Sequence, residues 1–358
     1  MIPSKYKLYI AFITILSATS CEFETTEYQS TLNPVSFRGF SNGYFILHRN
    51  SIDYYSCDGN KVFPNLYEHQ NGMPPGNGIH SFDIGLITCQ EDNRIEFIET
   101  VNLLSEGVLE IDKPRNIFSL HGRYSMVSFG DPGTGGVAAV DLVEKKFAKI
   151  IHTEIEAGKI YRKDNYLYVF SDGNSRSDST IIKCYFEQNS PSSLHKLEIF
   201  SIGIRPVDFV VMPINYEDYS HDGLAILCKG NETDPASIVL FDLVTEEATG
   251  SYQFISDIFP ENLFWFPIYH SWEIEDPAKK VLASYVNNKL YSLKLNNPVE
   301  MSVLINRNVS DLILQDDYYL TVSRDTASTE SYLYRFNRAT LNLMDSISIS
   351  PGALKLTK

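Results

Sequence analysis

The chain has 358 residues, 43% of them hydrophobic and 13% aromatic, which allows one large all-β domain or two medium ones. Its 30 basic and 45 acidic side chains give a formal net charge of −15, without a run of lysines and arginines. A negative field of this kind repels phosphate backbones and excludes nucleic acid as an expected partner.

The first 20 residues predict a secretory signal, because two lysines precede an uncharged apolar stretch, residues 8–18, that is too short to span a bilayer. The following Ala18-Thr19-Ser20-Cys21 resembles the lipobox of bacterial lipoproteins. By that resemblance, Cys21 carries lipid and anchors the protein in the bacterial envelope, at the periplasmic or surface side of the outer membrane. Residues 21–33 are then a flexible tether. An ordinary signal peptide with an incidental cysteine is the alternative.

Residues 34–358 are expected to form a single β-propeller, because short apolar segments alternate with polar turns. Four stretches align as strand, loop, strand, turn and strand, and their first strands are residues 124–129, 166–170, 224–228 and 318–323. The turns recur about every 45 residues on average, which is the length of a propeller blade. A pair of β-sandwiches is the competing fold.

Six blades are the first expectation and seven the alternative. Seven candidate units can be counted, and three of them fit the repeat less well: residues 44–63, 82–101 and 281–305. The closest internal match is between residues 140–144 and 241–245, where Asp141 and Asp242 both end a strand before a hairpin turn.

The segment Gly-Met-Pro-Pro-Gly-Asn-Gly-Ile-His-Ser-Phe at residues 72–82 is similar to a Gly-x-Gly-Pro-rich segment near the start of TolB-like propeller lipoproteins of the Bacteroides group. That family usually has a glutamate in this loop, which is absent here. The resemblance implies six blades and a periplasmic or surface lipoprotein. It transfers no catalytic residue.

No metal or cofactor is expected. None of the eight histidines lies within four residues of another, and no two of the five cysteines have a metal-ligand spacing. Residues 172–178 superficially resemble a calcium loop, but Arg176 occupies a would-be ligand position. Besides Cys21, the cysteines are predicted to be either disulfide-bonded or buried thiols of strands: Cys57, Cys89, Cys184 and Cys228.

Two surfaces are candidates for ligand binding. Polar loops follow corresponding strands of the repeat and would surround the axial opening of a propeller, so their side chains are candidate ligand contacts: Asp131, Asp172, Asn174, Asp178, Asn231, Asp234, Arg324 and Asp325. The second is an aromatic patch containing Trp265 and Trp272, which either bind a sugar or partner when exposed or belong to the core between blades.

These features predict a non-catalytic scaffold, anchored in the envelope, that binds a protein, a peptide or a glycan. The alternative is a propeller-type carbohydrate-active enzyme, either a hydrolase or a lyase. That alternative predicts two or three carboxylates, or a histidine with a tyrosine, converging at the axial opening.

Overall fold

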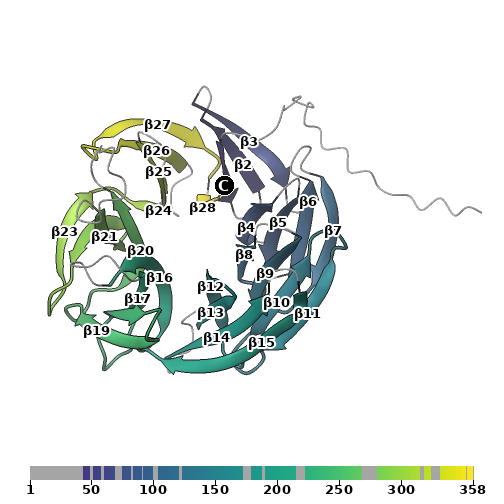
Figure 1. Cartoon of the computed structure of the whole chain (residues 1–358). Helices are drawn as coiled ribbons and strands as arrows, with labels where there is room; N and C mark the ends of the chain where they lie inside the picture. Colours follow the sequence, from purple (N-terminus) through teal and green to yellow (C-terminus); the bar gives the residue numbers. More distant parts are fainter. Residues whose placement is uncertain are drawn as a thin grey trace, which may run out of the picture. The chain divides into compact units, whose positions relative to one another are not determined.

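The chain folds as a seven-bladed β-propeller (Figure 1). The computed structural model describes residues 43–48, 51–57, 60–68, 75–81, 84–90, 92–99, 104–120, 123–171, 179–187, 190–214, 222–267, 280–314, 318–323, 331–351 and 353–357. These lie in the compact unit Phe37–Lys358 and form seven antiparallel sheets of four strands each. The predicted signal, tether and lipidation site lie outside the described residues.

We name the blades A to G and give their strands from the inner to the outer one. Blade A contains β28 (Ala353–Thr357), β1 (Gly43–His48), β2 (Ser51–Ser56) and β3 (Lys61–Glu68). Blade B contains β4 (Pro75–Ser81), β5 (Ile84–Cys89), β6 (Arg94–Glu99) and β7 (Ser105–Glu110). Blade C contains β8 (Asn116–Ser119), β9 (Tyr124–Phe129), β10 (Gly136–Asp141) and β11 (Lys146–His152). Blade D contains β12 (Ala157–Lys163), β13 (Tyr166–Ser171), β14 (Thr180–Glu187) and β15 (Ser190–Ser201). Blade E contains β16 (Pro206–Pro213), β17 (Asp222–Cys228), β18 (Ser237–Asp242) and β19 (Glu247–Gln253). Blade F contains β20 (Pro260–Pro267), β21 (Lys280–Val286), β22 (Lys289–Lys294) and β23 (Glu300–Ile305). Blade G contains β24 (Val309–Leu314), β25 (Tyr318–Ser323), β26 (Ser331–Asn337) and β27 (Leu343–Ile349).

Blade A closes the ring, because its inner strand β28 comes from the end of the chain and its other strands come from the start. β28 pairs antiparallel with β1, with Leu356 opposite Ile46. The buried carboxylate of Asp53 on β2 accepts hydrogen bonds from the backbone N–H of Ser350, at 3.1 Å, and from its hydroxyl, at 3.0 Å. Asp53 thereby ties the segment just before β28 to the start of the chain.

Hydrophobic packing between the blades holds the ring together. The described residues contain seven buried clusters, and each spans one pair of neighbouring blades. One sheet of this size cannot bury both of its faces alone, and stacking against two neighbours buries them. Middle strands are therefore the most apolar, as in β10, where every residue is buried.

The hairpins between third and fourth strands confirm the internal match found in the sequence. Asp141 Oδ1 accepts the backbone N–H groups of Val143 and Glu144, and Asp242 Oδ1 accepts those of Val244 and Thr245. This is the local turn that aspartate favours, in which its carboxylate replaces a backbone acceptor.

One of these hairpins also connects blades D and E. Glu246, which follows the turn of blade E, accepts a hydrogen bond from the Tyr168 hydroxyl at 2.7 Å and forms an ion pair with Lys183. Burial alone would raise the pKa of Glu246, but the hydrogen bonds from Lys183 and Tyr168 lower it.

The seven blades correct the first expectation of six and the count that the TolB-like resemblance implied. The three weakly matching segments all belong to complete sheets. In blade F, the second and third strands are joined by Asn287 and Asn288 alone, both with positive φ, in place of a longer polar loop. The repeat in the sequence is marked by that loop, so a blade with a two-residue turn matches it poorly.

Candidate functional site

The loops between second and third strands lie beside the links that join one blade to the next. The N–H of Gly130 donates to the carbonyl of Asp112 at 2.9 Å, and that of Gly133 donates to Glu154 at 2.9 Å. In blade E, the N–H of Lys229 donates to Arg205 at 3.0 Å. These loops and links thus occupy one end of the propeller, which we name the linker face.

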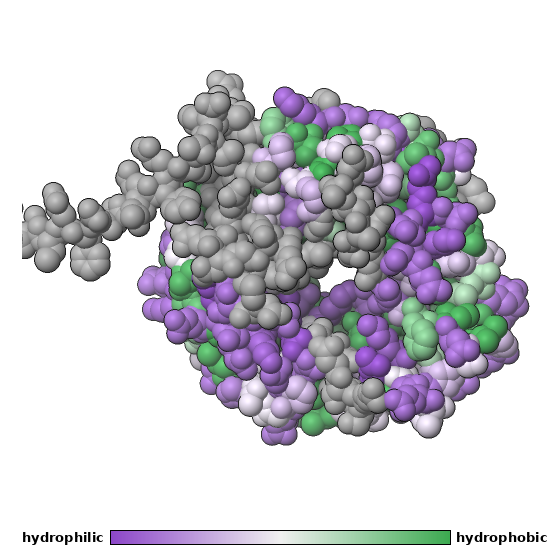
Figure 2. Space-filling model, turned by 180° about the vertical axis from the view of Figure 1, so that it is seen from behind, coloured by the Kyte–Doolittle hydropathy of each residue, from purple (hydrophilic) through white to green (hydrophobic). Residues whose placement is uncertain are grey.

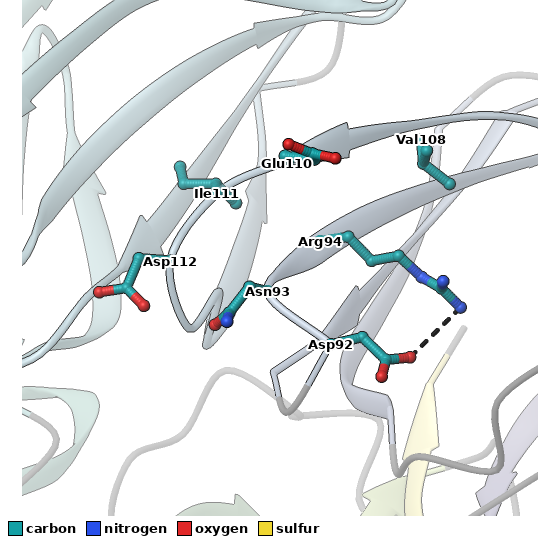
Figure 3. Close-up of a pocket in the computed structure, with 7 residues that line it drawn as sticks. All are labelled: Asp92, Asn93, Arg94, Val108, Glu110, Ile111 and Asp112. Atoms are coloured by element: carbon teal, nitrogen blue, oxygen red, sulfur yellow. Dashed lines mark ion pairs between the residues drawn. The ribbon is translucent and has the colours of Figure 1, made fainter.

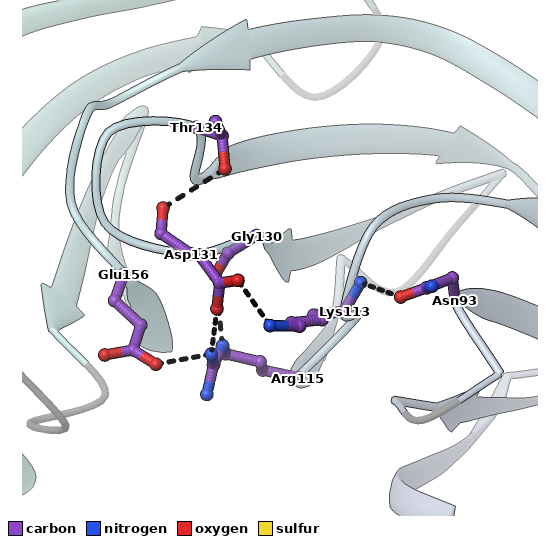
Figure 4. Close-up of polar contacts among 7 residues, drawn as sticks. All are labelled: Asn93, Lys113, Arg115, Gly130, Asp131, Thr134 and Glu156. Atoms are coloured by element: carbon purple, nitrogen blue, oxygen red, sulfur yellow. Dashed lines mark hydrogen bonds and ion pairs between the residues drawn. The ribbon is translucent and has the colours of Figure 1, made fainter.

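A polar network crosses three blades on the linker face (Figure 4). The N–H of Lys113 donates to Asn93 Oδ1 at 3.0 Å, and its ammonium group pairs with Asp131. Asp131 Oδ1 lies 3.5 Å from Arg115 Nη2, which also pairs with Glu156. The network therefore runs from a loop of blade B, through the link and loop of blade C, to the start of blade D.

The two ends of this network differ in exposure. Arg115 and Glu156 are buried, whereas the side chains of Lys113 and Asp131 are 42% and 43% exposed. The hydrogen bond to Asp131 raises the pKa of Lys113. A buried pair thus fixes the positions of a half-buried cation and a half-buried carboxylate.

A left-handed glycine positions Asp131. Gly130 has a φ of +86°, and a Cβ atom there would lie 2.6 Å from the Cα of Gly135. Gly230 has a φ of +66° in the equivalent loop of blade E, so both loops turn at a residue that favours glycine. Asp131 and Asn231 each follow this glycine.

Carboxylates also connect the inner strands of neighbouring blades. Asp208 on β16 pairs with Lys159 on β12 and accepts the backbone N–H of Leu263 on β20 at 3.0 Å. Asp311 on β24 similarly accepts the N–H of Leu356 on β28 at 2.8 Å. Charged groups at the starts of inner strands thus fix successive blades to each other.

Next to Asn93 is a cavity of about 480 Å³ in blade B (Figure 3). It lies between the loop before β6 and the end of β7, and it is lined by Asp92, Asn93, Arg94, Val108, Glu110, Ile111 and Asp112. Arg94 forms an ion pair with Asp92 at 3.3 Å. Because Asn93 belongs to both features, the cavity and the polar network are continuous on the linker face.

The linker face also carries exposed hydrophobic side chains. In the link between blades E and F, Ile255 is 55% and Phe259 is 67% exposed. Large exposed hydrophobic side chains are typical of contact surfaces between proteins. Figure 2 shows an opening at the centre of the ring, and hydrophilic residues border part of it.

The structure describes four of the predicted site residues. Asp131 lies in the polar network. Asn231 and Asp234 lie in the equivalent loop of blade E, where Asn231 Oδ1 accepts the N–H groups of Thr233 and Asp234, both at 2.8 Å. Trp265 is half-buried against the hydrophobic cluster between blades E and F. The others lie outside the described residues: Cys21, Asp172, Asn174, Asp178, Trp272, Arg324 and Asp325.

Within the described ranges, Cys57, Cys89, Cys184 and Cys228 are not joined by disulfide bonds, so the disulfide alternative is wrong. Burial raises the pKa of Cys89 to about 11 and the pKa values of Cys184 and Cys228 to about 12. The described ranges contain no group of three or more His, Cys, Asp or Glu side chains arranged to hold a metal ion. Nor do those ranges contain a helix that meets the length and hydropathy needed to cross a bilayer.

Comparisons with known proteins support the fold. No protein-family model matches the sequence, and no curated protein does. A putative 6-phosphogluconolactonase from Bacteroides fragilis superposes with a TM-score of 0.60 and 13% identity, over 88% of this chain and 98% of that one. A functionally unknown protein from Desulfotomaculum acetoxidans gives 0.58 and 12%, over 87% and 100%. BamB from Moraxella catarrhalis gives 0.53 and 8%, over 89% and 86%. The likeness is one of fold, without sequence support for a TolB-like family.

Proposed function

We propose that this propeller is an envelope-anchored binding scaffold that holds a partner protein on its linker face. The polar network from Asn93 to Glu156 carries the proposal, because it presents fixed charges beside a cavity. Rigid strands position these loops, as in many scaffolds whose binding residues lie on loops. Ile255 and Phe259 add apolar contact area on the same face.

The network favours binding over the hydrolase or lyase alternative. Asp131 and Glu156 both accept from the guanidinium group of Arg115. A glycoside hydrolase needs one carboxyl group that is protonated and free to donate to the leaving oxygen. Because Arg115 donates hydrogen bonds to both carboxylates, neither is free to act as that acid. The same hydrogen bonds fix the geometry of a binding surface.

The anchor in this proposal is the lipid on Cys21. Burial of acyl chains contributes about 0.8 kcal/mol per methylene, so two or three chains hold a protein on a membrane without a spanning helix. A Cys21→Ser variant should move from the membrane fraction to the soluble fraction of the envelope. Retention of this variant on membranes would contradict the lipid anchor but would not test the binding of a partner to the linker face.

Co-purification tests the binding face. Full-length protein is cross-linked to its neighbours in its native cells and isolated, and the bound proteins are quantified by mass spectrometry. Lys113→Glu should lose a partner that the wild type retains. Lys146→Glu is the matched control, because Lys146 is 63% exposed and follows the hairpin at the opposite end of the same blade. Equal recovery of every bound protein with both variants would contradict the proposal.

A further inference from the structure

The outer strand of blade B has an edge next to the cavity that no other strand of the sheet pairs with. β7 pairs with β6 on one side and is the last strand of its sheet. Val108, which is 51% exposed, and Glu110 both line the cavity, and they lie two residues apart on the same face of β7. An edge strand presents unpaired backbone N–H and C=O groups that an added strand can bond.

The charge of the cavity indicates what would bind there. Asp92, Glu110 and Asp112 line it together with one cation, Arg94, which pairs with Asp92. In the described part of the chain, Glu110 and Asp112 form no ion pair with a cation, although Asp112 contributes to the raised pKa of Lys113. Two carboxylates thus remain available to a positive group from a partner.

We infer that β7 accepts an extended, basic segment of a partner protein as a fifth strand of blade B. This inference rests on the proposed binding function and names the chemistry of the ligand. Backbone hydrogen bonds to the edge of β7 supply affinity, and pockets for alternate side chains supply specificity. A lysine or arginine of the segment lies beside Glu110 and Asp112, and an apolar side chain two residues away packs on Val108.

The probe is a labelled eight-residue peptide, Thr-Val-Thr-Lys repeated twice, which places valine and lysine on one face of an extended chain. Its binding to the full-length protein in detergent is measured by fluorescence anisotropy. The Glu110→Gln, Asp112→Asn double variant should bind it roughly twofold to thirtyfold more weakly, because it loses two exposed charge pairs with the peptide. The control double variant is Glu198→Gln, Glu247→Gln, which removes two exposed carboxylates from other outer strands, β15 and β19, and should bind normally.

Two further peptides separate strand addition from charge attraction. Glutamate in place of both lysines should abolish binding, and N-methylation of alternate backbone amides should abolish it with the charges intact. Equal binding of the lysine and glutamate peptides, undiminished binding of the N-methylated peptide, or no binding of the lysine peptide would each overturn the inference. Loss of a natural partner with Lys113→Glu in that situation would still support the proposed function, so the two failures are distinguishable.

Discussion

The ion pair between Arg115 and Glu156 offers a sharp test of how the linker face is built. Both residues are buried, at 8% and 4% exposure, and Arg115 also donates to the carbonyl of Gly130 at 3.3 Å. Removing one member of a buried pair leaves an uncompensated charge and costs about 3 to 5 kcal/mol. Replacing both members with apolar groups of similar size often costs far less. Arg115→Met and Glu156→Leu are the single changes.

The expected shift in melting temperature follows from the size of the propeller. The entropy of unfolding is about 2.1 cal/mol/K per residue, or roughly 0.7 kcal/mol/K for about 320 residues. Each single variant should therefore lower the Tm by roughly 4 to 7 °C, measured by differential scanning calorimetry. The double variant should lose less than the sum of the two singles, by at least about 1 kcal/mol. Additive losses would show that the two charges are not coupled and would refute this reasoning.

Three further predictions concern the loops, the hairpins and the thiols. Gly130→Ala should destabilise the fold by about 2 to 3 kcal/mol, and Gly133→Ala by about 1 kcal/mol, since both have positive φ but only Gly130 lacks room for a Cβ atom; equal urea midpoints would contradict this. The pKa of Glu246 is lowered in the folded protein. Its contribution to the free energy of unfolding is therefore fully present above the ordinary pKa of 4.5 and is lost as pH falls through the pKa of the folded state. The gap of roughly 1 kcal/mol between the unfolding free energies of wild type and Glu246→Gln should thus close in denaturation curves as pH falls below 4.5, and a gap that persists or widens there would count against the ion pair. Cys184 and Cys228 should react with iodoacetamide at pH 8 only after unfolding, as followed by peptide mass spectrometry; native labelling would contradict their burial.

Middle and outer strands could be predicted from the sequence because they alternate with clear turns. The predicted strands 124–129 and 318–323 coincide with β9 and β25. The apolar residues that predict these strands are the ones that pack between blades in the structure.

Inner strands escaped prediction for a physical reason. β12 and β16 contain lysine, aspartate, glycine and proline, and each has a register shift at its start. An inner strand lies next to the axial opening, so its side chains do not alternate between core and solvent as those of a half-buried strand do. β20 contains Trp265, for which the sequence predicts either an exposed aromatic patch or core between blades, and not an inner strand.

The candidate site was predicted only where one loop carries the signal. Asp131 is predicted because it lies in a polar loop that follows a strand of the repeat, whereas Arg115 and Glu156 meet across 41 positions of sequence. Arg115 and Glu156 do share a position in the repeat, because each directly precedes the inner strand of its blade, as Arg205 does in blade E. This shared position can be found in the sequence only when the inner strands are included in the repeat.

Site-specific photocrosslinking tests the central claim, that the linker face binds a partner, most directly. p-Benzoylphenylalanine replaces Phe259 on the linker face or Val143 in a hairpin at the opposite end, positions that are 67% and 66% exposed. In native cells, the probe at position 259 should form one discrete protein adduct that depends on light and is lost with Lys113→Glu, and the probe at 143 should form none. A discrete adduct at position 143 and none at 259 would place binding on the other face and contradict the account.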